Sequence, residues 1–529
     1  MKRTVVIISF ISLLFISALA DVKKNTSQDS PLRKLQVAEE VIKRIYVDSV
    51  DENKLVEDAI RGMLEKLDPH STYSTPKEMK DLTEPLNGEF DGIGVQYNML
   101  KDTLVVVQTI SDGPAERVGV IAGDKIVTVN DTSIAGVKMT QDEIKSRLRG
   151  KRGTKVRVGV IRRGIQKMLS FTIKRDKVPI ISIPTSYMIR PAVGYIKVEN
   201  FGAKTHQEFI SALNELKKEG MQSLIIDLQS NGGGYLHAAT NIANEFLADT
   251  CLIVLTKGRY FPDKAFYAKG DGKMQKGDVV VLVNEFSASA SEILAGALQD
   301  HDRGIIVGRR TFGKGLVQHP VQFKDGSMMR ITIAHYYTPA GRCIQKPYEK
   351  GNAKEYSLDM TKRLKHGEMM SADSIHFADS LKYRTLRKNR IVYGGGGIMP
   401  DYFVPLDTSR VTRFYRELMG KSVIIEQSLK YVNDNRSELQ KQYADFESFE
   451  RKFTVSQEYT DSVLHAGEEL KIVPRDDEEL QQTLPLLCLQ LKALVARDLF
   501  GISCYYRILN EDDAMVKRAL ELLANKSNH

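Results

Sequence analysis

The sequence predicts a multidomain α+β protein in which N-terminal helices, a small β-rich module, an α/β core and a helical end follow one another. Three observations predict this class: apolar residues at helical spacing near the N terminus, short β-rich runs divided by turns, and strands alternating with helices from about residue 190. A length of 529 residues allows about three or four domains. The hydrophobic content of 42% and charged content of 27% exclude a disordered chain and a multi-span membrane protein.

An export signal is predicted at the start of the chain. Lys2 and Arg3 precede the apolar run Val5–Phe15, and Ala18-Leu19-Ala20 has the small-x-small pattern that a signal peptidase reads. The sequence therefore predicts a signal peptide over residues 1–20 and an exported, periplasmic protein. The alternative is an uncleaved N-terminal anchor, for which the apolar stretch is short, and membrane association is expected only in that case.

Residues 21–85 are predicted to be helical, and residues 86–176 are predicted to form the β-rich module. The helical region is indicated by apolar residues at helix-like spacing: Leu35, Val37, Val41, Ile42 and Ile45, then Leu55, Ala59, Ile60, Met63 and Leu64. In the module, Gly113-Pro114-Ala115 opens a short helix. The expected strands of the module are Thr103–Ile110, Lys125–Asn130, Lys155–Ile161 and Met168–Ile173.

Residues 177–407 are predicted to form the α/β core, with the polar residues 349–390 as an excursion from it. Its expected strands are Val193–Val198, Ser223–Leu228, Asp278–Asn284 and Gly304–Val307. Its expected helices are His206–Lys218, Ala238–Phe246 and Ser291–Leu298. Residues 408–529 are helical in pattern and rich in charge, so we expect an appended helical domain there.

Cysteine usage and charge indicate neither a metal site nor a nucleic-acid partner. The four cysteines form no CxxC pair, and only Cys488 and Cys504 are close enough in sequence to suggest a disulfide. The net charge of +9, or +7 once the signal is removed, is spread thinly and forms no long basic block with interleaved aromatic residues. No metal or organic cofactor is implied.

The most informative segment is Val279–Gln318. An apolar strand is followed by the serine-rich stretch Ser287–Glu292 and then by an apolar helix. A serine at a helix start lies beside unpaired N–H groups and the positive end of the helix dipole, where a nucleophile whose attack creates an oxyanion is favoured. Ser289 and Glu292 also have the spacing of a capping box, so the serine taken alone is better explained as a helix cap.

A serine nucleophile needs a base, and Lys314 is the better candidate. His301 lies beyond the helix, about 15 Å from Ser289 at 1.5 Å per residue, and is better explained as a helix cap. Lys314 is flanked by two glycines, and a lysine whose pKa is lowered by burial can act as the base of a Ser-Lys dyad. Gln318 is four residues further on and could orient the Lys314 amine, or it could be an ordinary exposed amide.

Two glycine-rich segments each suggest a functional loop. Asn231-Gly232-Gly233-Gly234 follows an apolar strand and could supply the backbone donors of an oxyanion hole, but taken alone it is better explained as a tight turn. The stretch from Gly308 to Gly315 matches a phosphate-binding loop except at its last position, where Gly315 replaces the Ser or Thr that ligates Mg²⁺. Nucleotide binding is therefore not expected.

In combination, these motifs resemble the C-terminal processing (tail-specific) serine proteases. The resemblance covers about residues 31–407, and its motifs occur in the order expected for that family. In the core it is carried by Ser287–Glu292, Ala295–Asp300, Thr311–Gly315, Gln318 and the glycine loop Asp227–Gly234. Nearer the N terminus it is carried by Leu67–Ser71 and Phe90–Gly94, and Gly113-Pro114-Ala115 with Gly119–Asp124 is similar to a PDZ domain.

The resemblance implies a role for each matching residue. Ser289 would be the nucleophile, Lys314 the general base and Gln318 the residue that holds it, in a crotonase-like α/β core. The N–H groups of Gly234 and Ala290 would form the oxyanion hole.

The PDZ-like module would bind the free C terminus and apolar tail of a protein or peptide substrate, with Gly92, Ile93 and Gly94 as its candidate loop. The resemblance leaves an adaptor or a second copy of the chain open as a partner.

Two functions are weighed on this basis. The first is a serine endopeptidase that cleaves exported proteins after recognising their apolar, unstructured C-terminal tails. The alternative is a catalytically inactive, PDZ-type peptide-binding scaffold. The complete set of serine, lysine, glutamine and glycine loop favours the peptidase, because the loss of any one of them would suffice to inactivate it.

Overall fold

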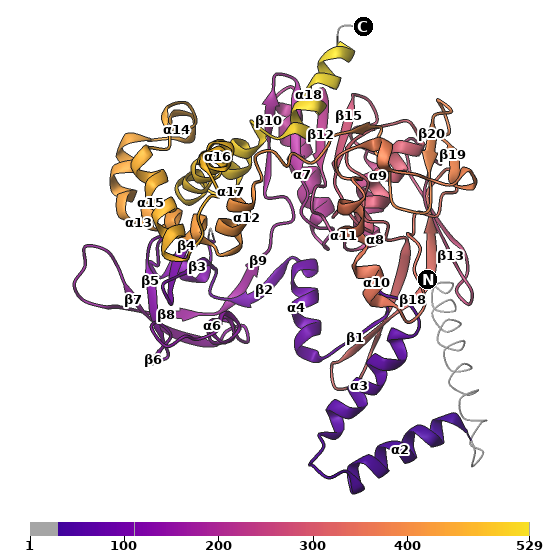
Figure 1. Ribbon diagram of the computed structural model, residues 1–529, viewed down its shortest axis with the longest axis horizontal. Helices are drawn as coiled ribbons and strands as arrows, with labels where there is room; N and C mark the ends of the chain where they lie inside the picture. The colour runs from indigo at the N-terminus through magenta and orange to yellow at the C-terminus, as the bar shows by residue number, and fades with distance from the viewer. Residues whose placement is uncertain (1–29, 111, 528–529) are drawn as a thin grey trace, which may run out of the picture. The chain divides into compact units, whose positions relative to one another are not determined.

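The computed structural model describes residues 30–110 and 112–527, and the predicted signal peptide lies outside them (Figure 1). The chain divides into two compact units. Of the described residues, the first unit takes 30–75, 320–331 and 348–356, and the second takes the others. Within the described residues, no helix combines the length and the apolar character needed to span a bilayer.

The first unit confirms the predicted N-terminal helices and adds a short strand. Its elements are α2 (Pro31–Ile45), α3 (Glu52–Glu65) and β1 (Thr72–Ser74). The side chain of Ser30 accepts the Arg33 N–H at the start of α2, where Pro31 fits because its missing N–H needs no partner. β1 pairs antiparallel with the start of β18 (Met328–Tyr337). Its three residues are too few to show a period-two pattern, so sequence reasoning missed it.

The β-rich module forms a sheet in the order β3-β4-β5-β7-β8, which confirms the predicted class for this segment. Its strands are β3 (Val95–Leu100), β4 (Thr103–Thr109), β5 (Lys125–Val129), β6 (Thr132–Ser133), β7 (Lys155–Ile161) and β8 (Leu169–Lys174). Its helices are α5 (Pro114–Arg117) and α6 (Gln141–Leu148). α4 (Pro76–Asn87) precedes the module, and β2 (Glu89–Gly92) pairs with β9 (Asp176–Pro179) where the chain enters and leaves it.

The core is built on a six-stranded sheet in the order β10-β11-β12-β15-β16-β21, parallel except for β10. Its strands are β10 (Thr185–Arg190), β11 (Val193–Lys197), β12 (Ser223–Asp227), β15 (Val279–Val283), β16 (Ile305–Gly308) and β21 (Tyr402–Phe403). Its helices are α7 (Thr205–Lys218), α8 (Leu236–Asn244) and α9 (Ala290–Asp300). β15 is buried at every position, as expected for a central parallel strand. The α/β prediction is confirmed.

Further strands form a separate sheet, and the excursion follows them in the chain. They are β13 (Leu252–Gly258), β14 (Lys264–Tyr267) and β17 (Leu316–Gln322), and β13 pairs antiparallel with both β14 and the end of β18. The excursion at 349–390 contains α10 (Ala353–Ser357), α11 (Asp359–Lys365), η1 (Ala372–Ser374), η2 (Asp379–Leu381) and β19 (Lys382–Arg384), and β20 (Ile391–Tyr393) follows it. The excursion thus forms short elements with defined bounds.

The C-terminal region is helical throughout, as predicted. Its helices are α12 (Arg413–Gly420), α13 (Val423–Gln442), α14 (Phe446–Lys452), α15 (Gln457–Glu469), α16 (Asp477–Phe500), α17 (Ile502–Asn510) and α18 (Ala514–Ser527). α12 to α17 share one apolar core, whereas α18 packs on β12, β15 and β16 of the six-stranded core sheet. The last helix therefore does not belong to the appended group, a difference that helical periodicity could not reveal. All four cysteines are free, including Cys488 and Cys504.

Candidate active site

Ser289 lies in the turn between the buried strand β15 and the buried helix α9. Its φ of 56° and ψ of −111° are unusual for a residue with a side chain. The turn is fixed from both sides, because the Ser287 hydroxyl donates to the Leu228 carbonyl at 2.8 Å and the Ser287 N–H donates to the Asn284 carbonyl at 2.9 Å. Residues 290–300 of the helix are buried without exception, so the turn is held at the start of a rigid element.

The glycine loop packs directly on this turn. Asn231, the residue before its three glycines, is fully buried, and its side chain accepts the Gly233 N–H at 2.8 Å. A Cβ atom on Gly233 would lie 2.8 Å from the Ser289 Cβ and 3.0 Å from the Ala290 N. Only glycine fits at this position. The predicted donors, the N–H groups of Gly234 and Ala290, thus belong to two segments that the fold brings into contact.

Lys314 and Gln318 lie at the entry to and within β17. The Lys314 Nζ donates to the Gln318 Oε1 at 3.2 Å, and both residues are half-buried. The two side chains therefore meet, as the sequence suggested, although Lys314 lies in the loop before β17 and only Gln318 lies on the strand.

Glu292 connects the serine turn to the lysine loop. Its carboxylate is fully buried, and its Oε2 accepts the Ser289 N–H at 2.8 Å and the Lys314 N–H at 2.9 Å. Its Oε1 accepts the Thr311 hydroxyl at 2.6 Å and the Gly313 N–H at 2.7 Å. Burial raises the pKa of Glu292, while these four donors favour the ionised form. One carboxylate oxygen thus fixes the backbones of both candidate catalytic residues.

Tyr336, on β18, makes a second connection between the same two residues. The residue is 1% exposed, and its hydroxyl lies against the Lys314 carbonyl and 3.1 Å from the Ser289 carbonyl. The phenol has a single O–H donor, so the two carbonyls share it. The backbones of Ser289 and Lys314 are therefore held at their N–H groups by Glu292 and at their carbonyls by Tyr336.

His301 and Asp300, at the end of α9, have structural surroundings. His301 is the C-cap residue of α9, as expected, and its ring Nε2 lies 2.7 Å from the Leu252 carbonyl. Asp300 and Arg342 form an ion pair at 2.5 Å in which both side chains are 0% exposed. An unpaired charge at this depth would be very costly, so the pair has a structural role.

Sequence reasoning treated Glu292 only as a helix cap and did not identify Tyr336. One signal could have identified Glu292: it is an acidic residue within a helix that is otherwise apolar and predicted to be buried, where a carboxylate needs several donors. Tyr336 carries no such signal, because an aromatic residue in a strand is usually a core residue.

The predicted tail-binding residues are in the β-rich module, in a different sheet from the catalytic candidates. Gly92 ends β2, Ile93 is buried, and Gly94 has a φ of 75° immediately before β3. The Ile93 carbonyl accepts the Ala115 N–H at 2.8 Å. β3 lies at the edge of its sheet, so the loop opens onto a strand that another strand could extend.

Comparison with known proteins identifies the family. A family model described as peptidase family S41 matches residues 192–351. The carboxy-terminal-processing protease of Bartonella bacilliformis is 34% identical over 351 residues, which cover 64% of this chain and 80% of the relative. The chain belongs to the C-terminal processing serine proteases. The protease CtpB of Bacillus subtilis is also 34% identical, over 69% of this chain and 74% of its own length.

Other family models match three further segments of this peptidase. Residues 92–174 match a PDZ domain and residues 16–77 match the N-terminal domain of the activating protease CtpB. Residues 414–501 match a family of unknown function. The solved photosystem II D1 C-terminal processing protease is 27% identical over 76% of this chain and 94% of its own, but its TM-score is only 0.37, so the assignment rests on the sequence relatives.

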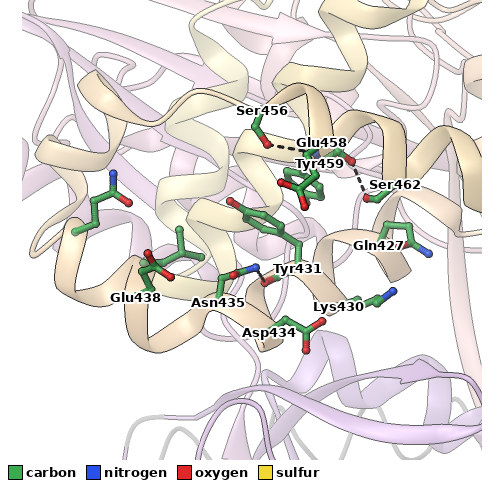
Figure 2. Close-up of a pocket in the computed structure, with 12 residues that line it drawn as sticks. Gln427, Lys430, Tyr431, Asp434, Asn435, Glu438, Ser456, Glu458, Tyr459 and Ser462 are labelled. Atoms are coloured by element: carbon green, nitrogen blue, oxygen red, sulfur yellow. Dashed lines mark hydrogen bonds between the residues drawn. The ribbon is translucent and has the colours of Figure 1, made fainter.

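The C-terminal helices of the peptidase contain a polar cavity of about 340 Å³ between α13 and α15 (Figure 2). Tyr431 and Tyr459 stack at its wall with ring centroids 3.9 Å apart, and Asp434, Glu438 and Glu458 lie around it. None of the predicted site residues lines this cavity. Over residues 30–110 and 112–527, no three His, Cys, Asp or Glu residues are grouped in a way that could hold a metal ion.

Proposed function

We propose that this serine peptidase is an endopeptidase with a Ser289–Lys314 dyad, and that it recognises its substrates by their apolar, unstructured C-terminal tails. The observation that carries the proposal is the shared carboxylate of Glu292, which accepts hydrogen bonds from the backbones of both residues. The contact of Gly233 with the Ser289 turn supports the proposed oxyanion hole.

The proposed reaction begins with proton transfer from the Ser289 hydroxyl to the neutral Lys314 amine as the hydroxyl oxygen attacks the scissile carbonyl. The N–H groups of Gly234 and Ala290 stabilise the resulting oxyanion. Lys314 then returns the proton to the leaving amine, which gives an acyl-enzyme on Ser289. Water, activated by the same amine, hydrolyses the acyl-enzyme. Gln318 keeps the amine oriented through its side-chain oxygen.

The PDZ domain is proposed to bind the substrate tail. Gly92, Ile93 and Gly94 would offer N–H groups to the terminal carboxylate, and the apolar tail would add as a strand to the edge of β3. This mode needs no particular internal sequence in the substrate, which fits a peptidase that selects proteins by their ends.

Export to the periplasm is proposed from the signal peptide predicted over residues 1–20, and only an uncleaved signal would retain the protein at a membrane.

We further propose that a second copy of the chain binds α2, which has no buried residue. Its apolar side chains are between 37% and 74% exposed: Leu32, Leu35, Val37, Val41, Ile42 and Ile45. Sedimentation of wild-type protein and of an Ile42→Glu variant tests this, because a monomeric wild type would contradict it.

The test of the dyad uses a peptide with an apolar, unstructured C terminus. Ser289→Ala and Lys314→Ala should each abolish cleavage without lowering the melting temperature by more than a few degrees. Amidation of the peptide's C terminus should raise KM and leave the chemistry intact, because it removes the carboxylate that the PDZ loop is proposed to bind. Full activity in either variant would refute the dyad, and equal cleavage of the amidated peptide would refute tail recognition.

A further inference from the structure

The loop that carries Lys314 has no regular secondary structure, so its backbone groups need specific partners. Residues 311–314 lie between β16 and β17 and together present four N–H donors and four carbonyl acceptors. All four N–H groups are used. The Thr311 N–H donates to the Ile398 carbonyl at 3.1 Å and the Phe312 N–H to the Ser287 carbonyl at 3.0 Å, and Glu292 accepts the other two.

The four carbonyls of this loop are also occupied, two of them by one side chain. The Lys346 N–H donates to the Gly313 carbonyl at 2.9 Å, and the Tyr336 hydroxyl lies against the carbonyl of Lys314. The remaining two carbonyls belong to Thr311 and Phe312. The guanidinium of Arg363 donates to them at 2.8 Å and 3.1 Å.

Arg363 comes from α11, a helix of the excursion at 349–390, and the family model for the peptidase ends at residue 351. The side chain is 4% exposed, and its Nε lies 3.0 Å from Asp359 Oδ2. The same Asp359 oxygen accepts the Lys346 Nζ at 2.9 Å, and that ammonium lies 4.1 Å from the centre of the Phe312 ring. The charge of Asp359 therefore holds the guanidinium beside the loop, where its planar fork reaches two acceptors at once.

We propose that Arg363 is a positioning residue for catalysis: it holds the two peptide groups before Gly313 and thereby sets the position of the Lys314 amine relative to Ser289. The excursion then completes the active site of this peptidase. This inference rests on the proposed function, because it takes Lys314 to be the general base. A loop glycine directly before the base makes such an anchor necessary, since Gly313, at a φ of 87°, leaves the chain free to turn.

The experiment compares Arg363→Met with Lys365→Met, a matched control that removes the same charge from an exposed position of the same helix. Arg363→Met should lower kcat by about tenfold to a hundredfold with KM within twofold of wild type, because a displacement of about 1 Å in a reacting group has that effect. Millimolar methylguanidinium should restore part of the loss. Lys365→Met should change neither parameter.

A second readout does not depend on activity. Hydrogen exchange of a peptide spanning residues 309–316 should be at least about tenfold faster in Arg363→Met and unchanged in Lys365→Met, because two charge-assisted hydrogen bonds are lost. Should Arg363→Met fail to fold, Arg363→Lys replaces it. One ammonium cannot reproduce the fork, so the Lys variant should fold, with a kcat reduced several-fold.

A kcat within twofold of wild type in Arg363→Met, or in the Lys variant if that alone folds, would overturn the proposal. Unchanged exchange of the loop would also overturn it. Failure of the proposed function is recognised separately, because in that case wild-type protein would cleave nothing, or Ser289→Ala would cleave as well as wild type.

Discussion

The carboxylate of Glu292 allows one substitution to be worked through in detail. Glu292→Gln keeps the size of the side chain and replaces one acceptor oxygen by an amino group. The amide can be oriented with its NH₂ in place of either oxygen. In place of Oε2, the NH₂ would face two backbone N–H donors, those of Ser289 and Lys314. In place of Oε1, it would face the Thr311 hydroxyl, which can rotate and accept from it, so this orientation is favoured. The Gly313 N–H, which donates to Oε1 at 2.7 Å, is then left without an acceptor.

The magnitude follows from that orphaned donor. A buried N–H without a partner costs about 1–3 kcal/mol, and each 1.36 kcal/mol is worth about a factor of ten in rate if the loop moves to relieve it. We therefore expect kcat to fall by about tenfold to a hundredfold. The loss of one buried charge offsets part of the effect on stability, so the melting temperature should change less than kcat suggests.

The assay is the initial rate of peptide cleavage over a range of substrate concentrations, with thermal unfolding measured on the same samples. The matched control is Glu245→Gln, which replaces another buried glutamate that accepts a backbone N–H, that of Lys273 at 2.9 Å, and pairs with His206. The control should lose stability without a selective loss of kcat. A Glu292→Gln enzyme with wild-type kcat, or a control that loses as much kcat at equal stability, would refute the reasoning.

Three further outcomes are expected. Gly233→Ala should reduce kcat by about a hundredfold or more, because the new Cβ would lie 2.8 Å from the Ser289 Cβ and Gly233 has a φ of 103°. The rate of peptide cleavage measures this effect, and a loss of less than about tenfold would contradict it. Tyr336→Phe should lower kcat several-fold with little change in KM, since it removes one hydroxyl donor from the Lys314 carbonyl, and steady-state kinetics decide the point. Burial raises the pKa of Asp513, so the folded state binds that proton more tightly than the unfolded state and stability falls as pH rises above about 3.9. The difference in melting temperature between Asp513→Asn and wild type should therefore increase, in favour of the variant, from acidic to neutral pH. A difference that stays constant with pH would contradict the raised pKa of Asp513.

The elements of the core could be predicted because each signals itself locally. β15 is a run of valine and leucine bounded by polar residues, and α9 follows as an apolar stretch of helical length. The spacing of four residues suggested the pairing of Lys314 with Gln318, but the contact itself depends on the fold of the loop that precedes β17.

The rest of the site depends on contacts between residues far apart in the chain. Tyr336 is 47 residues from Ser289, and Arg363 is 51 and 52 residues from the two carbonyls that it holds. A buried arginine in a polar excursion has the same sequence signature as an exposed one, because composition does not reveal which charge finds partners inside the protein. The sheet on which α18 packs could not be predicted for a similar reason, because an amphipathic helix has the same period whether it packs on helices or on a sheet.

The backbone conformation of Ser289 has a consequence for the choice of an inactive variant. A residue with a side chain in that region of φ and ψ costs about 1–3 kcal/mol, which glycine would not. Folding stability and peptidase activity therefore make opposite demands at this position, and Ser289→Gly should melt at a higher temperature than the active enzyme. Ser289→Ala retains the strained turn, so it is the inactive variant in which a bound substrate would contact an active site with the backbone conformation of the active enzyme.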